Sequence, residues 1–333
     1  MTIRILIVGL GNIGERHLQG VIEAAQVRPI EIVCVERSVE KVQNIKLRYG
    51  SATTLNLKVF PSLISVKGHF DLVIVATLSD SRFEAVLEMA HRSIDWQLLL
   101  LEKIPFASLT QYSRFRELYN DRLNKVFVNC PRGLWKGYKK IRSIVQNESL
   151  KSLKVTGSDW GICSNSMHFY ALALWLDPRL SQLPADAKFS NISRDDYSSE
   201  LQSPDRWRAK LYGCLEFYLN EAPVQISLED RPGVTREFSI DLEFTDTKVR
   251  INERTNTCAV IRDGCNVSQT HFETSLVSTV TADLVDCVER TGDLRPLPTF
   301  EDLYCCSEAI FYAFESVVDA LVKEGYAYKG FLS

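Results

Sequence analysis

Three glycines near the start of the chain have the spacing of a phosphate-binding turn. Gly9, Gly11 and Gly14 follow the order G-x-G-x-x-G, with Asn12 and Ile13 between the last two. In such a turn the first glycine permits a tight bend, the second lets a pyrophosphate approach the backbone, and the third lets a helix pack closely on a strand. The free N–H groups at the start of that helix then face the phosphates.

An acidic residue lies at the position that binds the adenosine ribose in motifs of this kind. Glu36 follows an apolar segment, residues 30–35, and is separated from Gly14 by the spacing of about 20 residues that this motif requires. A carboxylate there accepts hydrogen bonds from both hydroxyls of the adenosine ribose and repels a 2′-phosphate, which favours NAD. The neighbouring Arg37 leaves NADP open, because a guanidinium can hold that phosphate.

The elements around these residues alternate between two patterns. An apolar run over 3–8 is followed by an amphipathic stretch over 12–25, and this alternation continues as far as residue 129. It predicts an α/β fold, a doubly wound parallel sheet with right-handed crossovers, in which ligands bind beyond the carboxyl ends of the strands. The candidate binding residues at these ends are Thr77, Ser79, Glu102, Lys103, Asn129 and Arg132.

The character of the sequence changes near residue 133. Alternating segments separated by turns predict strands over 150–161, 207–219, 224–229, 236–243, 248–252 and 258–262, and apolar periodicity predicts helices over 165–176, 272–290 and 300–323. These patterns predict an α+β domain with a large, mostly antiparallel open sheet. We therefore expect two domains, a dinucleotide-binding domain over residues 1–132 and a second domain over residues 133–333.

The composition narrows the class of protein. The chain is 45% hydrophobic and 24% charged, as in soluble globular proteins, and its net charge of −3 predicts no binding to nucleic acid or to an anionic membrane. No apolar run reaches the length of about 18 residues that a membrane span needs, and we expect a cytoplasmic protein. The nine cysteines include no C-x-x-C pair, so we expect reduced thiols and no metal site.

Several of these motifs together resemble the Gfo/Idh/MocA oxidoreductases. They are the turn GLGNIGERH, the pair Ala76-Thr77 after the fourth strand, the pair Glu102-Lys103 after the fifth, and a β-rich second half with a histidine-bearing helix. The resemblance implies a Rossmann domain and hydride transfer between a nicotinamide cofactor and a carbinol carbon of a sugar, nucleotide-sugar or related polyol. It also implies a homodimer or homotetramer that forms through the open sheet of the second domain.

The resemblance also assigns catalytic residues. Lys103 matches the lysine of the family's Glu-Lys-Pro motif, and His168 matches the histidine that serves as general acid or base. Hydride transfer at an alcohol carbon requires a proton to move on its oxygen, and a group that titrates near neutral pH does this well. A lysine in a desolvated cleft shares this task or holds the substrate oxygen as a cation.

Four further residues are expected to bind the substrate together with His168. Asn129 and Arg132 offer groups for a hydroxyl, a carboxylate or a phosphate, and Trp160 offers a face for a sugar ring. Asn165 lies one helical turn before His168, where it can orient the imidazole or bind a hydroxyl.

The chain departs from the family's pattern at the reacting end. Ile104 separates Lys103 from Pro105, and Ser164 and Ala171 stand where the family often has aspartates beside the histidine. Without a carboxylate to stabilise the imidazolium, the histidine is a weaker base. Two alternatives therefore stay open: a non-catalytic nucleotide-binding sensor or regulator of the same fold, and an internal-redox enzyme with retained NAD.

Overall fold

The computed structural model describes residues 2–49, 56–180, 183, 185–197, 208–219, 224–233, 237–262 and 265–323. The chain divides into two compact units. Unit 1 contains Met1–Phe106, Thr110–Asn129 and Ser275–Phe300, and unit 2 contains Ala107–Leu109, Cys130–Thr274 and Glu301–Ser333. Each unit is thus built from three separate segments of the chain, whereas the sequence suggested one boundary after residue 132.

Unit 1 is built around a six-stranded parallel sheet. Its strands are β1 (Ile3–Val8), β2 (Ile30–Val35), β3 (Asn56–Phe60), β4 (His69–Val75), β5 (Asp95–Leu101) and β6 (Val126–Val128), in the order β3-β2-β1-β4-β5-β6. The central strands are near-continuous buried apolar runs because helices cover both of their faces. Since β1 pairs with both β2 and β4, the strand order reverses beside β1, where ligands of such sheets bind. The predicted Rossmann topology is confirmed.

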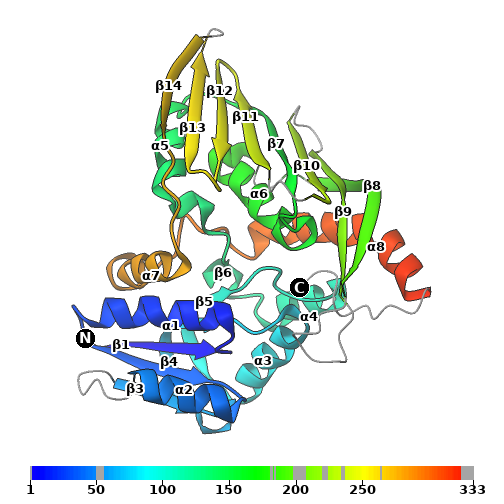
Figure 1. The fold of residues 1–333 in the computed structure, drawn as a ribbon. Helices are drawn as coiled ribbons and strands as arrows, with labels where there is room; N and C mark the ends of the chain where they lie inside the picture. The colour runs from blue at the N-terminus through cyan, green and yellow to red at the C-terminus, as the bar shows by residue number, and fades with distance from the viewer. Residues whose placement is uncertain are drawn as a thin grey trace. The chain divides into compact units, whose positions relative to one another are not determined.

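The strands of unit 1 are connected by helices, and one later helix joins them. The connecting helices are α1 (Asn12–Ala25), α2 (Val39–Tyr49), α3 (Ser79–His91) and α4 (Leu109–Leu118). Helix α7 (Val277–Thr291) packs along α1 (Figure 1). The contact is close because Gly20 has no side chain, and a Cβ there would lie 2.2 Å from the carbonyl oxygen of Ser278. This packing explains why residues 275–300 belong to unit 1.

Unit 2 contains a mixed eight-stranded sheet. Its strands are β7 (Leu150–Ser158), β8 (Ala185–Tyr197), β9 (Arg208–Leu219), β10 (Gln225–Arg231), β11 (Phe238–Phe244), β12 (Thr247–Asn252), β13 (Thr257–Arg262) and β14 (Cys265–His271). They lie in the order β14-β13-β12-β11-β7-β10-β9-β8, in which β7 and β10 run parallel and the other pairs antiparallel. The prediction of a large, mostly antiparallel sheet is confirmed.

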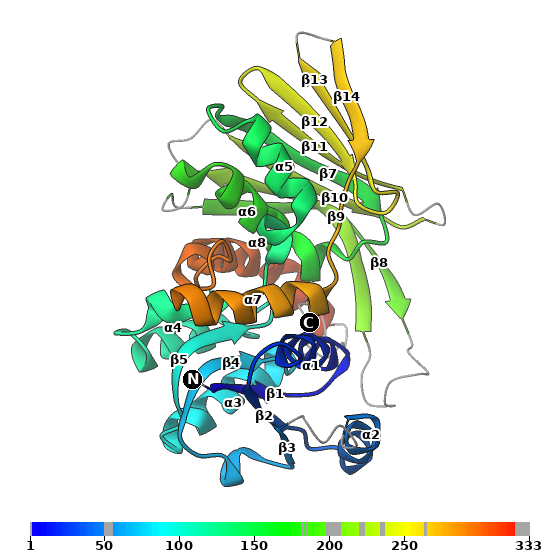
Figure 2. The ribbon, with the colours of Figure 1, turned by 90° about the vertical axis from the view of Figure 1, so that its left-hand side faces the viewer.

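Helices cover one face of this sheet. They are α5 (Lys136–Ile144), α6 (Ile162–Leu176) and α8 (Tyr304–Lys323), of which α6 packs on β7, β9 and β10 and α8 on β8 (Figure 2). Strand β11 shows the resulting alternation, since Phe238, Ile240 and Leu242 are buried and the residues between them are half-exposed. No helix in the described ranges is long and apolar enough to cross a bilayer.

Candidate functional site

The turn between β1 and α1 gives its three glycines different roles. Gly9 has φ +89°, and a Cβ there would meet Thr77 Cγ2 at 2.8 Å. A Cβ on Gly14 would lie 1.9 Å from the carbonyl oxygen of Gly9, so the first and third glycines are required by packing. A Cβ on Gly11 would meet nothing within 4 Å. The backbone at Gly11 therefore faces open space.

The start of α1 offers hydrogen-bond donors to that space. Gly11 is the N-cap and provides no side-chain cap, so the first N–H groups of the helix can bind an external acceptor. Ile13, in the first turn, is 42% exposed, and Asn12 is exposed beside it. At the end of β4, the buried Oγ1 of Thr77 has no hydrogen-bond partner among the described residues. A dinucleotide fits this donor set, because its phosphates and hydroxyls supply the acceptors that the turn lacks.

Glu36 lies against the glycine turn, as its spacing predicted. One carboxylate oxygen accepts the backbone N–H of Leu10 at 2.8 Å, and the other accepts that of Ser38 at 2.9 Å. Each oxygen keeps a second lone pair for a ribose hydroxyl. The neighbouring Arg37 is exposed. The geometry thus fixes the carboxylate beside the turn, and its binding of a ribose stays a prediction.

A buried arginine holds the segment that carries Lys103. Arg82 lies on α3 with 3% of its surface exposed, and its guanidinium donates hydrogen bonds to four backbone carbonyl oxygens. The acceptors belong to Thr77, Glu102, Ile104 and Pro105. Burial lowers the pKa of Arg82 to about 10, which the charge of Glu102 partly offsets. The guanidinium therefore stays charged at neutral pH and ties the end of β4 to the turn after β5.

Glu102 points into the interior of unit 1, although the sequence suggested contact with the cofactor. Its Oε1 accepts hydrogen bonds from His17 Nε2 at 3.0 Å and from Asn129 Nδ2. Burial alone would raise the pKa of this carboxyl, but the hydrogen bond and charge of His17 and the bond from Asn129 hold it below its usual value. Asn129 is only 4% exposed. The side chains of Glu102 and Asn129 thus bind each other, and their predicted roles in cofactor and substrate binding stay predictions.

The predicted contact of Ser79 with the cofactor stays a prediction. Ser79 is 4% exposed in the first turn of α3. The residue before it, Leu78, is 42% exposed at the carboxyl end of β4. An apolar side chain is therefore also exposed at this strand end.

In unit 2, the helix that carries His168 is fixed by a buried carboxylate. Asp230, on β10, is 1% exposed and accepts three backbone N–H groups at the start of α6. The donors are Trp160 at 3.2 Å, Gly161 at 2.8 Å and Ile162 at 3.1 Å. These N–H groups have no partner within the helix, so Asp230 supplies the cap. His168, on the next turns of α6, is half-buried.

The side chain of Trp160 is engaged within unit 2. Its indole N–H donates to the carbonyl oxygen of Glu229 at 2.9 Å, and its ring packs edge-to-face on Phe169 with centroids 5.4 Å apart. Trp160 is 9% exposed, and its predicted stacking on a sugar stays a prediction. Asn165 donates to the carbonyl oxygen of Trp160 at 2.6 Å, and its binding of substrate stays a prediction.

Arg132 forms a buried ion pair and not a free anion-binding group. Its Nε and Nη2 each lie 2.8 Å from an oxygen of Glu253, and Tyr138 donates to the same carboxylate at 2.6 Å. The guanidinium also lies 4.2 Å from the ring centroid of Phe169. Burial would lower the pKa of Arg132, but the charge and hydrogen bonds of Glu253 raise it above its usual value. The ion pair gives Arg132 a structural role, and its predicted role in substrate binding stays a prediction.

Comparison with known proteins supports the interpretation of the glycine turn. Residues 3–130 match the model of an oxidoreductase family with an NAD-binding Rossmann fold. No curated protein matches the chain.

Solved structures share the fold of the whole chain. A super-repressor mutant of Gal80p from Saccharomyces cerevisiae is similar with a TM-score of 0.72 and 15% identity, over 96% of this chain and 97% of that one. An oxidoreductase from Agrobacterium radiobacter in complex with NAD+, L-tartaric acid and magnesium gives 0.68 and 10%, over 96% and 97%. The UDP-N-acetylglucosamine 3-dehydrogenase GnnA from Acidithiobacillus ferrooxidans gives 0.66 and 13%, over 95% and 99%. Identities this low show a common fold alone.

Proposed function

Because the chain belongs to the Gfo/Idh/MocA oxidoreductase family, whose NAD-binding Rossmann domain its residues 3–130 match, we propose that it is an NAD(P)-dependent dehydrogenase or reductase. It acts on a CH–OH group of a sugar, nucleotide-sugar or related polyol. The observation that carries this proposal is the open space at Gly11, at the uncapped start of α1. Open space beside uncapped helix N–H groups is what a pyrophosphate requires.

The cofactor is held by residues of unit 1. The backbone of Gly9, Gly11 and Gly14, with Asn12 and Ile13 in the first helical turn, takes the pyrophosphate side. Glu36 takes the adenosine ribose and favours NAD, while the exposed Arg37 leaves NADP as a second cofactor. When bound, the nicotinamide ring accepts or supplies the hydride.

The proton that accompanies the hydride is assigned to Lys103 and His168. An alcohol oxygen must lose a proton as its carbon becomes a carbonyl, and gains one in the reverse direction. Both residues lie on elements that buried side chains hold in place, since Arg82 binds the turn around Lys103 and Asp230 caps the helix of His168. Fixed elements of this kind are what acid–base catalysis needs.

A turnover screen tests this proposal. The protein is mixed with NAD or NADP and a panel of sugars, polyols and nucleotide-sugars, and nicotinamide absorbance is followed. We expect Lys103→Ala and His168→Ala to lower kcat/KM about 10²–10⁴-fold. The exposed residues Lys67 and His91 provide matched controls, and Lys67→Ala and His91→Ala should keep wild-type rates. Full activity in both site variants would contradict the assignment.

A second function is favoured by one feature of α6. Ser164 and Ala171 flank His168 without a carboxylate, which suits a nucleotide-binding regulator that has lost the chemistry. The shared fold includes proteins described as Gal80p transcriptional regulators. Calorimetry that shows tight NAD binding, together with silence in the turnover screen, would support this function. Protein that purifies with bound NAD and shows no net reduction would instead support internal redox with retained NAD.

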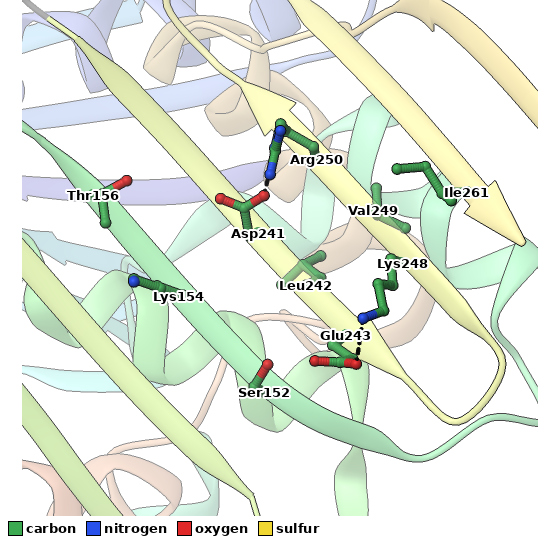
Figure 3. Close-up of a pocket in the computed structure, with 10 residues that line it drawn as sticks. All are labelled: Ser152, Lys154, Thr156, Asp241, Leu242, Glu243, Lys248, Val249, Arg250 and Ile261. Carbon is green, nitrogen blue, oxygen red and sulfur yellow. Dashed lines mark hydrogen bonds and ion pairs between the residues drawn. The ribbon is translucent and has the colours of Figure 1, made fainter. Parts of the chain in front are cut away.

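We also propose that the open face of the eight-stranded sheet binds a second copy of the chain. A hollow of about 390 Å³ on this face is lined by residues of β7, β11, β12 and β13 (Figure 3). Its charges alternate in sign: Lys248 pairs with Glu243 at 2.8 Å and Arg250 with Asp241 at 2.6 Å, and Lys154 lies beside them. Mixed charge of this kind can complement itself across a two-fold axis. Sedimentation should show a dimer or tetramer that Lys154→Glu weakens, and a monomer would contradict the proposal.

A further inference from the structure

A chain of buried side chains connects α1 with the turn that carries Lys103. His17, on α1, has its Nδ1 2.8 Å from Thr281 Oγ1 on α7, and its Nε2 3.0 Å from Glu102 Oε1. Asn129 donates to the same oxygen of Glu102. Thr281 and His17 are 0% and 1% exposed. Glu102, which directly precedes Lys103, is thus hydrogen-bonded to α1. The first turn of α1 faces the open space at Gly11.

The hydrogen bonds assign one hydrogen to Nε2 of His17. Glu102 is ionised at neutral pH, because its pKa lies below the usual value, and an ionised carboxylate only accepts. Nε2 therefore carries the hydrogen that Glu102 accepts at 3.0 Å. The hydroxyl of Thr281 lies 2.8 Å from Nδ1 of His17 and 2.8 Å from the carbonyl oxygen of Val277, so it holds the other side of the ring. His17 and Glu102 thus form a buried, charge-assisted hydrogen bond.

Stability alone is a weak explanation for such a pair. Taking a charged carboxylate out of water is costly, and apolar side chains of the same shape often stabilise a core equally well. What the pair of His17 and Glu102 adds is direction, because charge-assisted hydrogen bonds have a defined geometry. Here that geometry fixes the carboxylate of Glu102, whose backbone continues directly into Lys103.

We propose that His17 is a positioning residue that holds Lys103 in place through Glu102 and links its position to the phosphate-binding turn. The link to the cofactor rests on the proposed function, whereas the effect of His17 on Lys103 does not. Binding of a dinucleotide at the start of α1 orders the helix on which His17 lies. The same hydrogen bonds then hold the turn that contains Lys103.

The test measures the acylation rate of Lys103 by mass spectrometry after brief exposure to acetic anhydride, with and without NADH. His17→Leu removes both hydrogen bonds, and we expect Lys103 to be acylated about tenfold faster because its turn opens more often. His17→Gln retains an N–H donor and should restore most of the wild-type rate. NADH should slow acylation in the wild-type protein and fail to do so in His17→Leu.

A control separates positioning from general destabilisation. Asp71→Asn weakens the 2.7 Å hydrogen bond from the backbone N–H of Arg4, at the start of the adjacent strands β1 and β4. It should leave acylation of Lys103 unchanged. A wild-type rate in His17→Leu, or the same increase in Asp71→Asn, would overturn the proposal. If NADH does not protect Lys103 in the wild-type protein but the variants still differ, the proposed cofactor binding fails and the positioning role stands.

A spectroscopic measurement tests the hydrogen bond between His17 and Glu102 directly. The chain has five histidines, and ¹⁵N-histidine NMR distinguishes a doubly protonated ring from either neutral tautomer. His17→Gln identifies the signal of His17 by its loss. We expect Nε2 of His17 to carry a hydrogen. A ring protonated on Nδ1 alone would overturn the proposed hydrogen bond to Glu102.

Discussion

Arg82 and Ile104 are joined by a hydrogen bond from Nη1 of the guanidinium to the backbone carbonyl oxygen, across 22 positions of the sequence. The same guanidinium binds carbonyl oxygens on either side of Ile104 and at the end of β4. The turn that carries Lys103 therefore depends on one buried cation.

Replacing Arg82 should destabilise the protein strongly. Arg82→Met leaves four buried carbonyl oxygens without their donor, and we expect the free energy of unfolding to fall by about 3 kcal/mol or more. Arg82→Lys keeps the charge but not the planar set of donors, so it should recover only part of this loss. Urea unfolding followed by circular dichroism measures both. As a control, Arg92→Lys changes a surface pair with Glu88 and should cost less than about 1 kcal/mol; equal losses at the two positions would contradict this explanation.

The carboxylate of Glu102 should make stability depend on pH. Its pKa in the folded protein lies below the usual 4.5, so the unfolded state takes up protons first as the pH falls. The stabilisation is complete above the unfolded pKa and is lost as the pH falls from there through the folded pKa. The variant Glu102→Gln has no carboxyl at this position that could titrate. Melting temperatures of the two proteins should therefore converge as the pH is lowered below about 4.5, and a constant difference from neutral to acid pH would argue against an ionised Glu102.

Asp230 should determine where α6 begins. Its two oxygens accept three backbone N–H groups, and Asp230→Asn replaces one acceptor oxygen with a donor. We expect a loss of about 1–3 kcal/mol and faster amide exchange over residues 160–165. Asp246 is exposed, and Asp246→Asn should change neither quantity. Unchanged exchange at the start of α6 in Asp230→Asn would show that the cap is not needed.

Arg132 and Glu253 should behave as a coupled pair. Arg132→Met leaves the carboxylate of Glu253 buried with Tyr138 as its remaining hydrogen-bond donor among the contacts described, and Glu253→Gln leaves the guanidinium without a counter-charge. Each single change should cost about 3–5 kcal/mol, and the double change should cost clearly less than the sum. A double-mutant cycle in urea measures the coupling. Additive losses would mean that the two side chains act independently.

The sequence predicted unit 1 more closely than unit 2. β1, α1 and β2 have the bounds that the apolar runs, the glycines and the helical periodicity indicated. In parallel sheets both faces of a strand are covered, so the strand is apolar throughout and easy to recognise. β8 and β14 were not predicted. They form the two edges of the eight-stranded sheet, where polar residues weaken the alternating pattern.

The predictions of site residues follow the same division. The glycine turn and Glu36 form a local signature, and the structure brings them together. The partners of Glu102 and Arg132 lie 85 and 121 positions away, and no local pattern specifies such a pairing. The start of α6 was placed three residues late because its cap comes from β10. No partner of His17 was predicted, since a histidine on a buried helix face carries no sign of its distant partner.

The central claim is that the turn between β1 and α1 binds the pyrophosphate of a nicotinamide dinucleotide. Gly11 has φ −64°, and a Cβ there meets nothing within 4 Å of the protein, so Gly11→Val should fold with nearly wild-type stability. Its side chain would occupy the space assigned to the pyrophosphate. The most direct measurement is therefore NADH fluorescence titration of wild-type protein and of Gly11→Val, once thermal unfolding has shown that the two proteins have similar melting temperatures. We predict tight binding to the wild type and a loss of affinity of at least about tenfold in the variant, and equal affinities, or no binding by the wild type, would contradict the claim.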